Sequence, residues 1–329
     1  MSRTIDYSSC RDRAMAASVS SVSNDLISEL LLGMRLNSVQ FGIIRFQRLL
    51  GVGFTNAGGR AQFHFVANGP VWLRAPGGTV YALDTGDALL IPRGGPHAVV
   101  CAPGTTDAEV TAFDPATGPG PGPGDCAPHP ADATIFSCCM ELDLGGMQPL
   151  IDAMPEVMLV NALPASSPEI TPMLDAMLRE STAQQAGHAG ILVRLAEVVA
   201  ALIVRGWAAR GCGHATGWVG ALHDPRLSKA ILMMHKAPGR NWTVEELAKE
   251  AGNSRSVFAQ RFSLATGVSP LRYLTDLRMR LAVHSLRNDN QSVESVAGQL
   301  GYGSLAAFSR AFKRSVGTSP GTVRNNSNA

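Results

Sequence analysis

Gln260 and Arg310 occupy matching positions in two segments of the chain that repeat each other. Residues 243–248 (TVEELA) recur 49 residues later as residues 292–297 (SVESVA). After one inserted residue, further positions recur: Ser254, Phe258, Phe262, Gly267, Ser269 and Pro270 return as Ser304, Phe308, Phe312, Gly317, Ser319 and Pro320. A repeat of this period indicates one supersecondary unit used twice. A glutamine amide can pair bidentately with adenine and a guanidinium with guanine, so the two positions could read base edges in a major groove.

Each copy has the pattern of a helix, a tight turn and a second helix. Thr243 and Ser292 can cap the first helix of their copies, because a short hydroxyl side chain satisfies an orphan backbone N–H. Gly252 and Gly301 follow these helices, where a left-handed residue commonly ends a helix. In the second helix of each copy, two phenylalanines four residues apart would be buried on one face. These features are typical of the helix-turn-helix, whose second helix enters the major groove.

The solvent-facing side of each second helix supplies candidate contacts to DNA. Steps of about 100° per residue turn these positions away from the phenylalanines. For base contacts the pattern predicts Ser256, Ala259, Gln260, Ala306, Ala307 and Arg310. For phosphate contacts it predicts Arg255, Ser309, Lys313 and Arg314. The alternative is an ordinary solvated helix face, and the duplication of the motif favours the nucleic-acid interpretation.

Charge is distributed unevenly along the 329 residues. Residues 223–329 hold 15 Lys and Arg against 7 Asp and Glu, whereas residues 1–222 hold 13 against 19. The formal net charge of +2 therefore conceals a basic module carried on an acidic one. This asymmetry is typical of a nucleic-acid-binding domain joined to a separate domain, and the chain is long enough for two cores.

The N-terminal half changes its hydrophobic period from helical to strand-like. Leucines, an isoleucine and a methionine at helical spacing predict an amphipathic helix over 24–40. Gly, Pro and Asn then bound short segments predicted as strands, at 41–48, 61–67, 70–75, 79–83, 87–91, 97–101 and 133–144. Strands of this length and spacing favour a barrel or a jelly roll. The low-complexity stretch 102–132, centred on GPGPGPG, is expected to be an exposed loop.

Helical spacing returns at 168–210, where the helices either pack on the core or form a dimer interface. A Gly-containing stretch that begins at Gly211 predicts an interdomain linker. The expected organisation is a tail and helix at 1–40, a sensor domain at 41–145, a helical region at 146–210, a linker at 211–222, a DNA-binding domain at 223–324 and a tail at 325–329.

Two histidines lie in stretches with recognisable spacing. The stretch Gly86-x5-Pro92-x-Gly94-x2-His97 has the spacing of the second signature motif of cupins, in which this histidine ligates a metal. The first cupin motif is only partly present, because His64 stands in place while Val66 replaces the second histidine. Residues 41–145 thus resemble the cupin sensor domain of one branch of AraC-type regulators. The resemblance implies a domain that binds an effector instead of catalysing.

His64 and His97 are therefore candidate ligands of a divalent metal, and strand alternation would place Cys101 on the same face. The alternative is a pocket in which the histidines bond to each other, to the backbone or to an effector. His64, Trp72 and His97 are the candidate effector-pocket residues. A redox role would involve Cys101, Cys138 and Cys139, although a lone cysteine is usually a small buried hydrophobe.

Residues 223–324 resemble the DNA-binding domain of the AraC/XylS family of transcription regulators. The matching stretches are 243–248, Ser254, Phe258, 261–262, 267–270, 273–274, 278–282, 296–297, 301–302, 308–314, Gly317, 319–320 and Arg324. The resemblance implies a long linking helix at about 270–288 that holds two recognition helices in successive major grooves on one face of the DNA. Such a spacing corresponds to one helical turn of DNA, roughly 34 Å.

The expected fold is therefore a multidomain α+β chain: a cupin-like β-barrel followed by helices, then an all-α domain with two helix-turn-helix motifs. The expected function is a sequence-specific, DNA-binding transcription regulator whose cupin-like domain senses a small molecule or chemical stress. One alternative is a cysteine-based regulator that responds to oxidants or electrophiles. Another is a cupin metalloenzyme with an accessory DNA-binding domain.

The partners expected for this function are double-stranded promoter DNA, a small-molecule effector, a second copy of the chain in a homodimer and, for an activator, RNA polymerase. No catalytic constellation and no cofactor beyond the candidate metal is expected. Residues 1–25 lack the apolar region of a signal peptide, and no long uncharged apolar run follows. The expected location is the cytoplasm.

Overall fold

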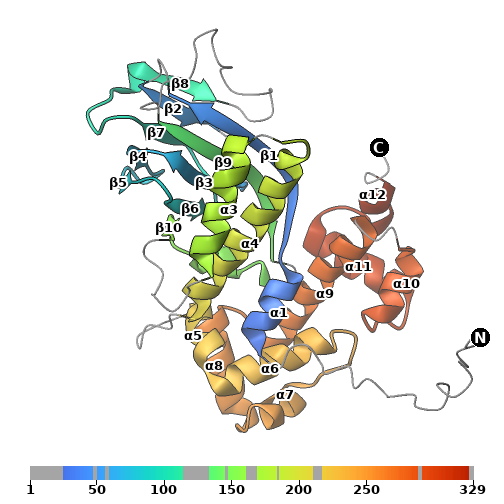
Figure 1. Ribbon diagram of the computed structural model, residues 1–329. Helices are drawn as coiled ribbons and strands as arrows, with labels where there is room; N and C mark the ends of the chain where they lie inside the picture. The colour runs from blue at the N-terminus through green and yellow to red at the C-terminus, as the bar shows by residue number, and fades with distance from the viewer. Residues whose placement is uncertain are drawn as a thin grey trace, which may run out of the picture.

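The computed structural model describes residues 25–46, 50–55, 59–113, 133–144, 147–160, 169–183, 185–209, 217–287 and 291–325. The strands gather in the upper part of the molecule, and the helices that follow them in sequence lie in front of the strands and below them (Figure 1). Within these residues, no helix is both long enough and apolar enough to span a membrane.

Two five-stranded sheets form the N-terminal part. The first has the order β1-β9-β3-β6-β10, and the second has the order β5-β4-β7-β2-β8. The strands are β1 (Arg35–Arg45), β2 (Gly51–Phe54), β3 (Ala61–Asn68), β4 (Val71–Arg74), β5 (Val80–Leu83), β6 (Ala88–Ile91), β7 (His97–Val100), β8 (Val110–Phe113), β9 (Thr134–Asp143) and β10 (Met158–Leu159). Neighbouring strands are antiparallel except for β2 and β8. The predicted cupin-like fold class is confirmed, in the form of two facing sheets.

The central strands are buried on both faces, and the alternation of their side chains separates two cores. In β9, Phe136 and Cys138 belong to a core under the helices, whereas Ile135 belongs to the core between the sheets. In β3, Phe63 likewise faces the helices and Val66 faces the second sheet. Burial on both faces explains why these strands have nearly continuous apolar runs.

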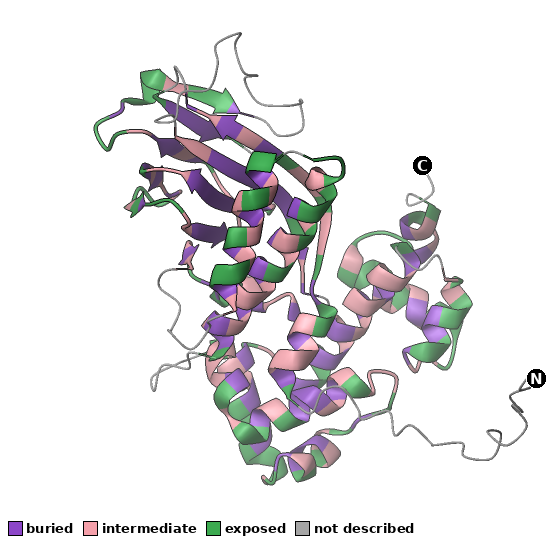
Figure 2. Cartoon of the chain, viewed as in Figure 1, coloured by how far each residue is buried: buried purple, intermediate pink, exposed green. Residues whose placement is uncertain are grey.

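Helices α3 (Ile170–Ala183) and α4 (His188–Ala209) cover the outer face of the first sheet. One stripe of α4 is fully buried, as shown by Leu192 and Val199. The neighbouring stripe faces solvent, so the helix is purple on one side and green on the other in Figure 2. Core packing therefore accounts for one face of α4, and the other face is exposed to solvent.

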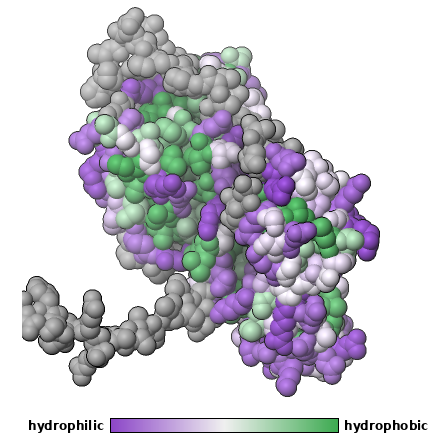
Figure 3. Space-filling model, turned by 90° about the vertical axis from the view of Figure 1, so that its right-hand side faces the viewer, coloured by the Kyte–Doolittle hydropathy of each residue, from purple (hydrophilic) through white to green (hydrophobic). Residues whose placement is uncertain are grey.

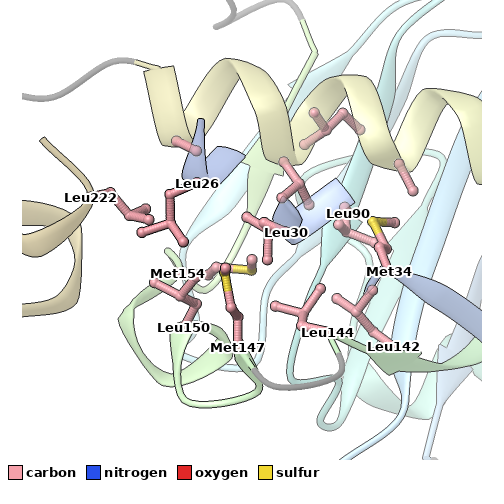
Figure 4. Packing of buried hydrophobic residues seen from close by; sticks show 14 of the residues in the cluster. Leu26, Leu30, Met34, Leu90, Leu142, Leu144, Met147, Leu150, Met154 and Leu222 are labelled. Atoms are coloured by element: carbon pink, nitrogen blue, oxygen red, sulfur yellow. The ribbon is translucent and has the colours of Figure 1, made fainter. Parts of the chain in front are cut away.

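The short helix α1 (Leu26–Gly33) connects the sheet domain with the helices that follow it. Asp25 caps the helix by accepting a 2.8 Å hydrogen bond from the Ser28 N–H. Figure 4 shows Leu26 and Leu30 of α1 beside a group of buried methionines and leucines, with Leu222 of α5 close to Leu26. The helix also packs against α6 and α4, so it joins the two parts of the molecule.

The C-terminal part is helical throughout its described residues. Its elements are α5 (Gly217–His223), α6 (Pro225–Lys236), α7 (Val244–Glu250), α8 (Arg255–Thr266), α9 (Pro270–Arg287), α10 (Val293–Gln299), α11 (Leu305–Val316) and α12 (Pro320–Asn325). A small helix, α2 (Leu150–Ala153), packs against α5 from the sheet domain. The helix expected at about 270–288 is present as α9.

Four segments differ from the sequence-based expectation. The helix predicted over 24–40 ends at Gly33, because residues from Arg35 onward pair with β9 and become strand β1. Strand β2 was not predicted, since its sequence GVGF resembles a turn. A side chain at Gly51 or Gly53 would collide with Val110, so only glycine allows β2 to lie this close to its neighbours.

The linker predicted over 211–222 is helical from Gly217 onward, as α5. Ala221 and Leu222 of this helix are buried in the core that the two parts share, and this burial stabilises the helix. The loop predicted over 102–132 contains strand β8, because Val110–Phe113 pairs in parallel with β2. Residues 114–132 and 211–216 lie outside the described residues.

Candidate nucleic-acid interface and sensor site

Local capping explains where the first helix-turn-helix begins. The Thr243 hydroxyl accepts a hydrogen bond from the Glu246 N–H (3.1 Å), and the Glu246 carboxylate accepts one from the Thr243 N–H (2.8 Å). This reciprocal pair is a capping box. Gly252, with φ of 60°, then adopts the left-handed conformation between α7 and α8. The turn therefore follows from residues that lie close together in sequence.

Helix α8 buries Phe258 and Phe262, whose ring centroids lie 5.6 Å apart. Its outer face exposes Arg255, Ser256 and Gln260, while Ala259 is half-buried. Three more exposed side chains were not predicted as contacts: Val257, Arg261 and Leu264. Arg261 is paired with Asp224, the N-cap residue of α6, at 3.3 Å.

Helix α11 has the same design with a different surface. Phe308 and Phe312 are buried, with ring centroids 5.7 Å apart. The predicted contact residues Ala306, Arg310, Lys313 and Arg314 are exposed, whereas Ala307 and Ser309 are half-buried. A shallow hollow of about 450 Å³ lies beside the helix, and its lining includes Ser309, Arg310 and Lys313. Within the described residues, Arg310 and Gln260 occupy equivalent exposed positions of the two copies.

The relative position of the two copies depends on contacts that the motif itself does not indicate. Arg278 of α9 donates hydrogen bonds to the carbonyl oxygens of Pro238 (2.7 Å) and Arg240 (2.9 Å), which precede α7. Gly239 and Gly301 touch through their backbones, and a Cβ on either glycine would overlap the chain of the other copy. Gly301 repeats Gly252 in the sequence, but nothing in the sequence indicates its contact with Gly239.

The two copies belong to different cores. Phe258 and Phe262 lie in a cluster that continues through α5 and α6 into the sheet domain. Phe308 and Phe312 lie in a separate cluster that contains α10, α12 and the second half of α9. The linking helix α9 divides accordingly, since Leu277 belongs to the first cluster and Met279 to the second. The first helix-turn-helix is therefore continuous with the sheet domain, and the second is attached through α9.

The sheet domain brings His64 of β3 and His97 of β7 together, although they lie in different sheets. Their Nε2 atoms are 2.8 Å apart, and Phe54 stacks on the His97 ring with a centroid distance of 4.8 Å. Burial lowers the pKa of His64 well below its usual value, and burial also lowers the pKa of His97. Both rings are therefore neutral near pH 7.

The hydrogen bonds determine the tautomer of each ring. The Gly95 carbonyl oxygen can only accept, so His97 Nδ1 carries a proton and donates to it (2.8 Å). His97 Nε2 then accepts from His64 Nε2. His64 Nδ1, left as an acceptor, receives the hydroxyl proton of Ser137 on β9 (2.9 Å). A single chain of donors thus runs from Ser137 through both histidines to Gly95.

This arrangement does not fit a metal centre. The two histidines supply two nitrogen ligands, whereas metal sites with histidine ligands usually have three or four protein ligands. Across the described ranges, no group of three or more His, Cys, Asp or Glu side chains is arranged to hold a metal ion. The pair is therefore better described as part of a hydrogen-bonded interior.

The other predicted sensor residues lie in different surroundings. Trp72 alternates with Val71 and Leu73, which are buried in the core between the sheets, so Trp72 points away from the histidines. Cys138 faces the helices, and burial raises the pKa of its thiol to about 12. Cys101 is half-buried against the core between the sheets, on the side predicted for it, and burial raises the pKa of its thiol. High pKa values disfavour the thiolate that redox sensing requires.

A polar row inside the sheet domain was not predicted. Gln40, Cys139 and Gln62 lie directly opposite one another on β1, β9 and β3, on the same face as His64. Gln62 is 1% exposed, and both polar atoms of its side-chain amide lack a hydrogen-bond partner among the described residues. The same is true of Gln40 Oε1. Buried amides without partners are costly, so this row is suited to a polar guest.

Comparisons with known proteins agree with this geometry. A cupin family matches residues 25–209, and a helix-turn-helix domain family matches residues 247–326. A putative AraC-like transcription regulator of Streptomyces lividans is 36% identical over 175 residues, which cover 53% of this chain and 58% of that protein. The chain thus spans little more than half the length of this relative.

Two further proteins align over most of the chain. The HTH-type transcriptional regulator AlkR of Acinetobacter baylyi is 30% identical over 277 residues, which cover 80% of this chain and 87% of that protein. Among solved structures, ToxT of Vibrio cholerae covers 87% of this chain and 96% of its own, at 12% identity and a TM-score of 0.34. The cupin family matches more than half of this chain, and a regulator that is 30% identical aligns with most of it. This chain therefore belongs to the AraC-type transcription regulators that carry an N-terminal cupin domain.

Proposed function

We propose that α8 and α11 are recognition helices that bind one promoter site in successive major grooves. The observation that carries this proposal is the equivalent, exposed position of Gln260 and Arg310 on two helices whose opposite faces are locked into cores by phenylalanine pairs. Gln260 would pair with adenine and Arg310 with guanine. Ser256, Ala259, Ala306 and Ala307 would complete the surface that approaches the base edges.

Phosphate contacts would come from the cationic side chains around these positions. Lys313 and Arg314 follow Arg310 on α11, and Arg255 begins α8. Their charges would position the helices and add salt-dependent affinity without specifying sequence. The half-buried Ser309 hydroxyl would add a shorter contact.

The effector pocket would lie between the two sheets, where the histidine pair and the row at Gln62 face the same interior. An effector with both donors and acceptors would satisfy the Gln62 amide and could replace the Ser137–His64 hydrogen bond. Either event would shift β9 (Thr134–Asp143), which contains Ser137 and ends at Asp143, 3.7 Å from His284 of the linking helix. This path would connect sensing to the pose of the DNA-binding helices.

A homodimer would form through the sheet domain. Ile191 and Val198 of α4 are each 46% exposed, and Phe41 of the neighbouring edge strand β1 is also exposed. Figure 3 shows a broad hydrophobic area over this upper part of the molecule. A second copy of the chain would cover this apolar surface, because two copies would bind a DNA site of twice the length. RNA polymerase would be a further partner if the bound promoter is activated.

The test is binding of the purified full-length protein to a library of genomic fragments at two salt concentrations. Selective binding near a small number of promoters, lost in the double variant Gln260→Ala with Arg310→Ala, would support the proposal. Arg179→Gln, at an exposed position of α3, serves as the control for loss of a charge elsewhere. Uniform binding to all fragments in both proteins would refute base reading by these helices.

A further inference from the structure

A cleft separates the sheet domain from the linking helix. Its volume is about 750 Å³, within the range of small-molecule sites. One wall is formed by α9 and the end of α11, and the other by the ends of β1 and β9. The two walls meet where His284 Nδ1 lies 3.7 Å from Asp143 Oδ2. Both the sensor and the DNA-binding domain therefore contribute to one cavity.

The two walls carry opposite charge. Arg280 and Arg287 of α9 line the cleft, and spacings of three and four residues place them on one face with His284. The half-buried Arg280 guanidinium also lies 5.9 Å from the centre of the Tyr273 ring. Glu141 and Asp143 line the opposite wall, and as alternate residues of β9 they share a face. A third arginine on the helix wall, Arg272, already pairs with Asp276 at 3.0 Å.

This distribution selects the charge of a ligand. An anion would be attracted by the arginines and repelled by the carboxylates, and a cation would experience the reverse. A molecule with one charge of each sign satisfies both walls when its charges lie at opposite ends. The half-buried Val283 supplies apolar surface between the charged groups. The cleft volume accommodates a molecule of amino-acid or dipeptide size.

We propose that the interdomain cleft binds a small zwitterion, with its carboxylate on Arg280 and Arg287 and its ammonium group on Glu141 and Asp143. This inference rests on the proposed function, because it assigns the bound molecule a regulatory effect on DNA binding. The first helix-turn-helix shares a core with the sheet domain, whereas the second is attached through α9. A ligand that bridges the cleft therefore fixes the second recognition helix relative to the first.

The experiment titrates the full-length protein with the twenty amino acids and a set of net-neutral dipeptides, by calorimetry and by thermal shift. At least one zwitterion should bind. Its N-acetyl form, which lacks the cation, and its C-terminal amide, which lacks the anion, should each bind roughly tenfold more weakly or worse. The exposed positions Glu141→Gln and Arg287→Gln should produce comparable losses, while Arg179→Gln on α3 should leave binding unchanged.

Three outcomes would overturn the proposal: no binding by any member of the panel at millimolar concentration, equal binding of the acetylated form, or binding unaffected by either cleft substitution. Fragment binding by the same preparations separates this question from the function itself. Intact promoter binding with no cleft ligand refutes the zwitterion site alone, whereas loss of selective DNA binding in the wild-type protein refutes the regulator proposal.

Discussion

The two helix-turn-helix copies have the same elements but different attachments. The first is joined to the sheet domain by a continuous core through α1, α5 and α6. The second has its own core and is linked through α9, Arg278 and the contact between Gly239 and Gly301. Duplication of a motif therefore need not duplicate its mechanical role. The first copy can act as a fixed reference, and the second as the part whose position is adjusted.

Their surfaces differ as well. Helix α11 exposes Arg310, Lys313 and Arg314. On α8 the exposed Arg261 is held by Asp224, and the position equivalent to Arg314 is Leu264, which is 76% exposed. We expect the second copy to contribute more of the electrostatic affinity for DNA and the first to contribute more through Gln260 and apolar contacts.

The largest effects should come from the buried phenylalanines. Phe258→Ala and Phe308→Ala should each cost about 3–5 kcal/mol of stability in the unit that contains them. Hydrogen exchange on the full chain should show Phe258→Ala weakening the sheet domain together with α7 and α8. Phe308→Ala should increase exchange only in α10–α12 and the end of α9. Equal loosening of the sheet domain by both variants would contradict the division into two cores.

Equivalent glycines offer a matched pair at the next level. Gly252 and Gly301 both have positive φ, at 60° and 76°, so alanine at either should cost about 1 kcal/mol or more. Only Gly301→Ala would also press a Cβ against the Gly239 backbone, whereas the space around Gly252 is open. Thermal unfolding should rank Gly301→Ala as the more destabilising, and DNA affinity should fall more. Equal effects of the two substitutions would show that the Gly239 contact is unimportant.

Acid should weaken the first copy before the second. His235 bonds to the Tyr273 hydroxyl at 2.7 Å, and burial lowers its pKa to about 3. The pKa of a histidine in the unfolded chain is about 6.5. Neutral His235 therefore contributes fully to the stability of the folded state above that pH. This contribution declines as pH falls toward 3, and about 2 kcal/mol of it is lost at pH 5. The lowered pKa values of His64 and His97 likewise make the folded state less stable as pH falls. Unfolding curves at pH 7 and pH 5 should differ, and His235→Phe should reduce the difference.

Substitution of the base-reading residues should change the free energy of DNA binding by an amount similar to or smaller than the stability changes above. Arg310→Ala should relax preference at one base pair and cost about 1–3 kcal/mol, and Gln260→Ala should do the same at a different base pair about one DNA turn away. The measurement is affinity for every single-base variant of a selected site. If both variants retain the full base preference, the assigned faces of α8 and α11 are wrong.

The smallest effect should be a change in salt dependence. Lys313→Ala should weaken binding similarly for all sequences and reduce the slope of log affinity against log salt by about 1. Ser263, the equivalent position on α8, provides the control, since Ser263→Ala removes no charge. A sequence-dependent loss for Lys313→Ala would move this residue from the phosphate group to the base-reading group.

Local features were predictable because neighbouring residues produce them. Thr243 and Ser292 cap helices, Gly252 and Gly301 follow those helices with positive φ, and phenylalanines four residues apart form one buried face whatever the rest of the chain does. The spacing around His97 similarly indicated a strand-rich domain. Predictions failed where the outcome depended on distant partners: β2 was missed, and residues 35–40 pair with β9 instead of extending α1.

By itself, the sequence determined the duplicated DNA-binding motif, its exposed faces and the class of the N-terminal domain, since helix periodicity, caps and strand alternation are short-range properties. Only the tertiary structure decided that the first copy shares a core with the sheet domain. It also decided that His64 and His97 form a neutral hydrogen-bonded pair, that Trp72 points away from them, and that opposite charges face each other across a cleft. Each of these depends on contacts between residues far apart in the chain, whose pairing no local spacing encodes.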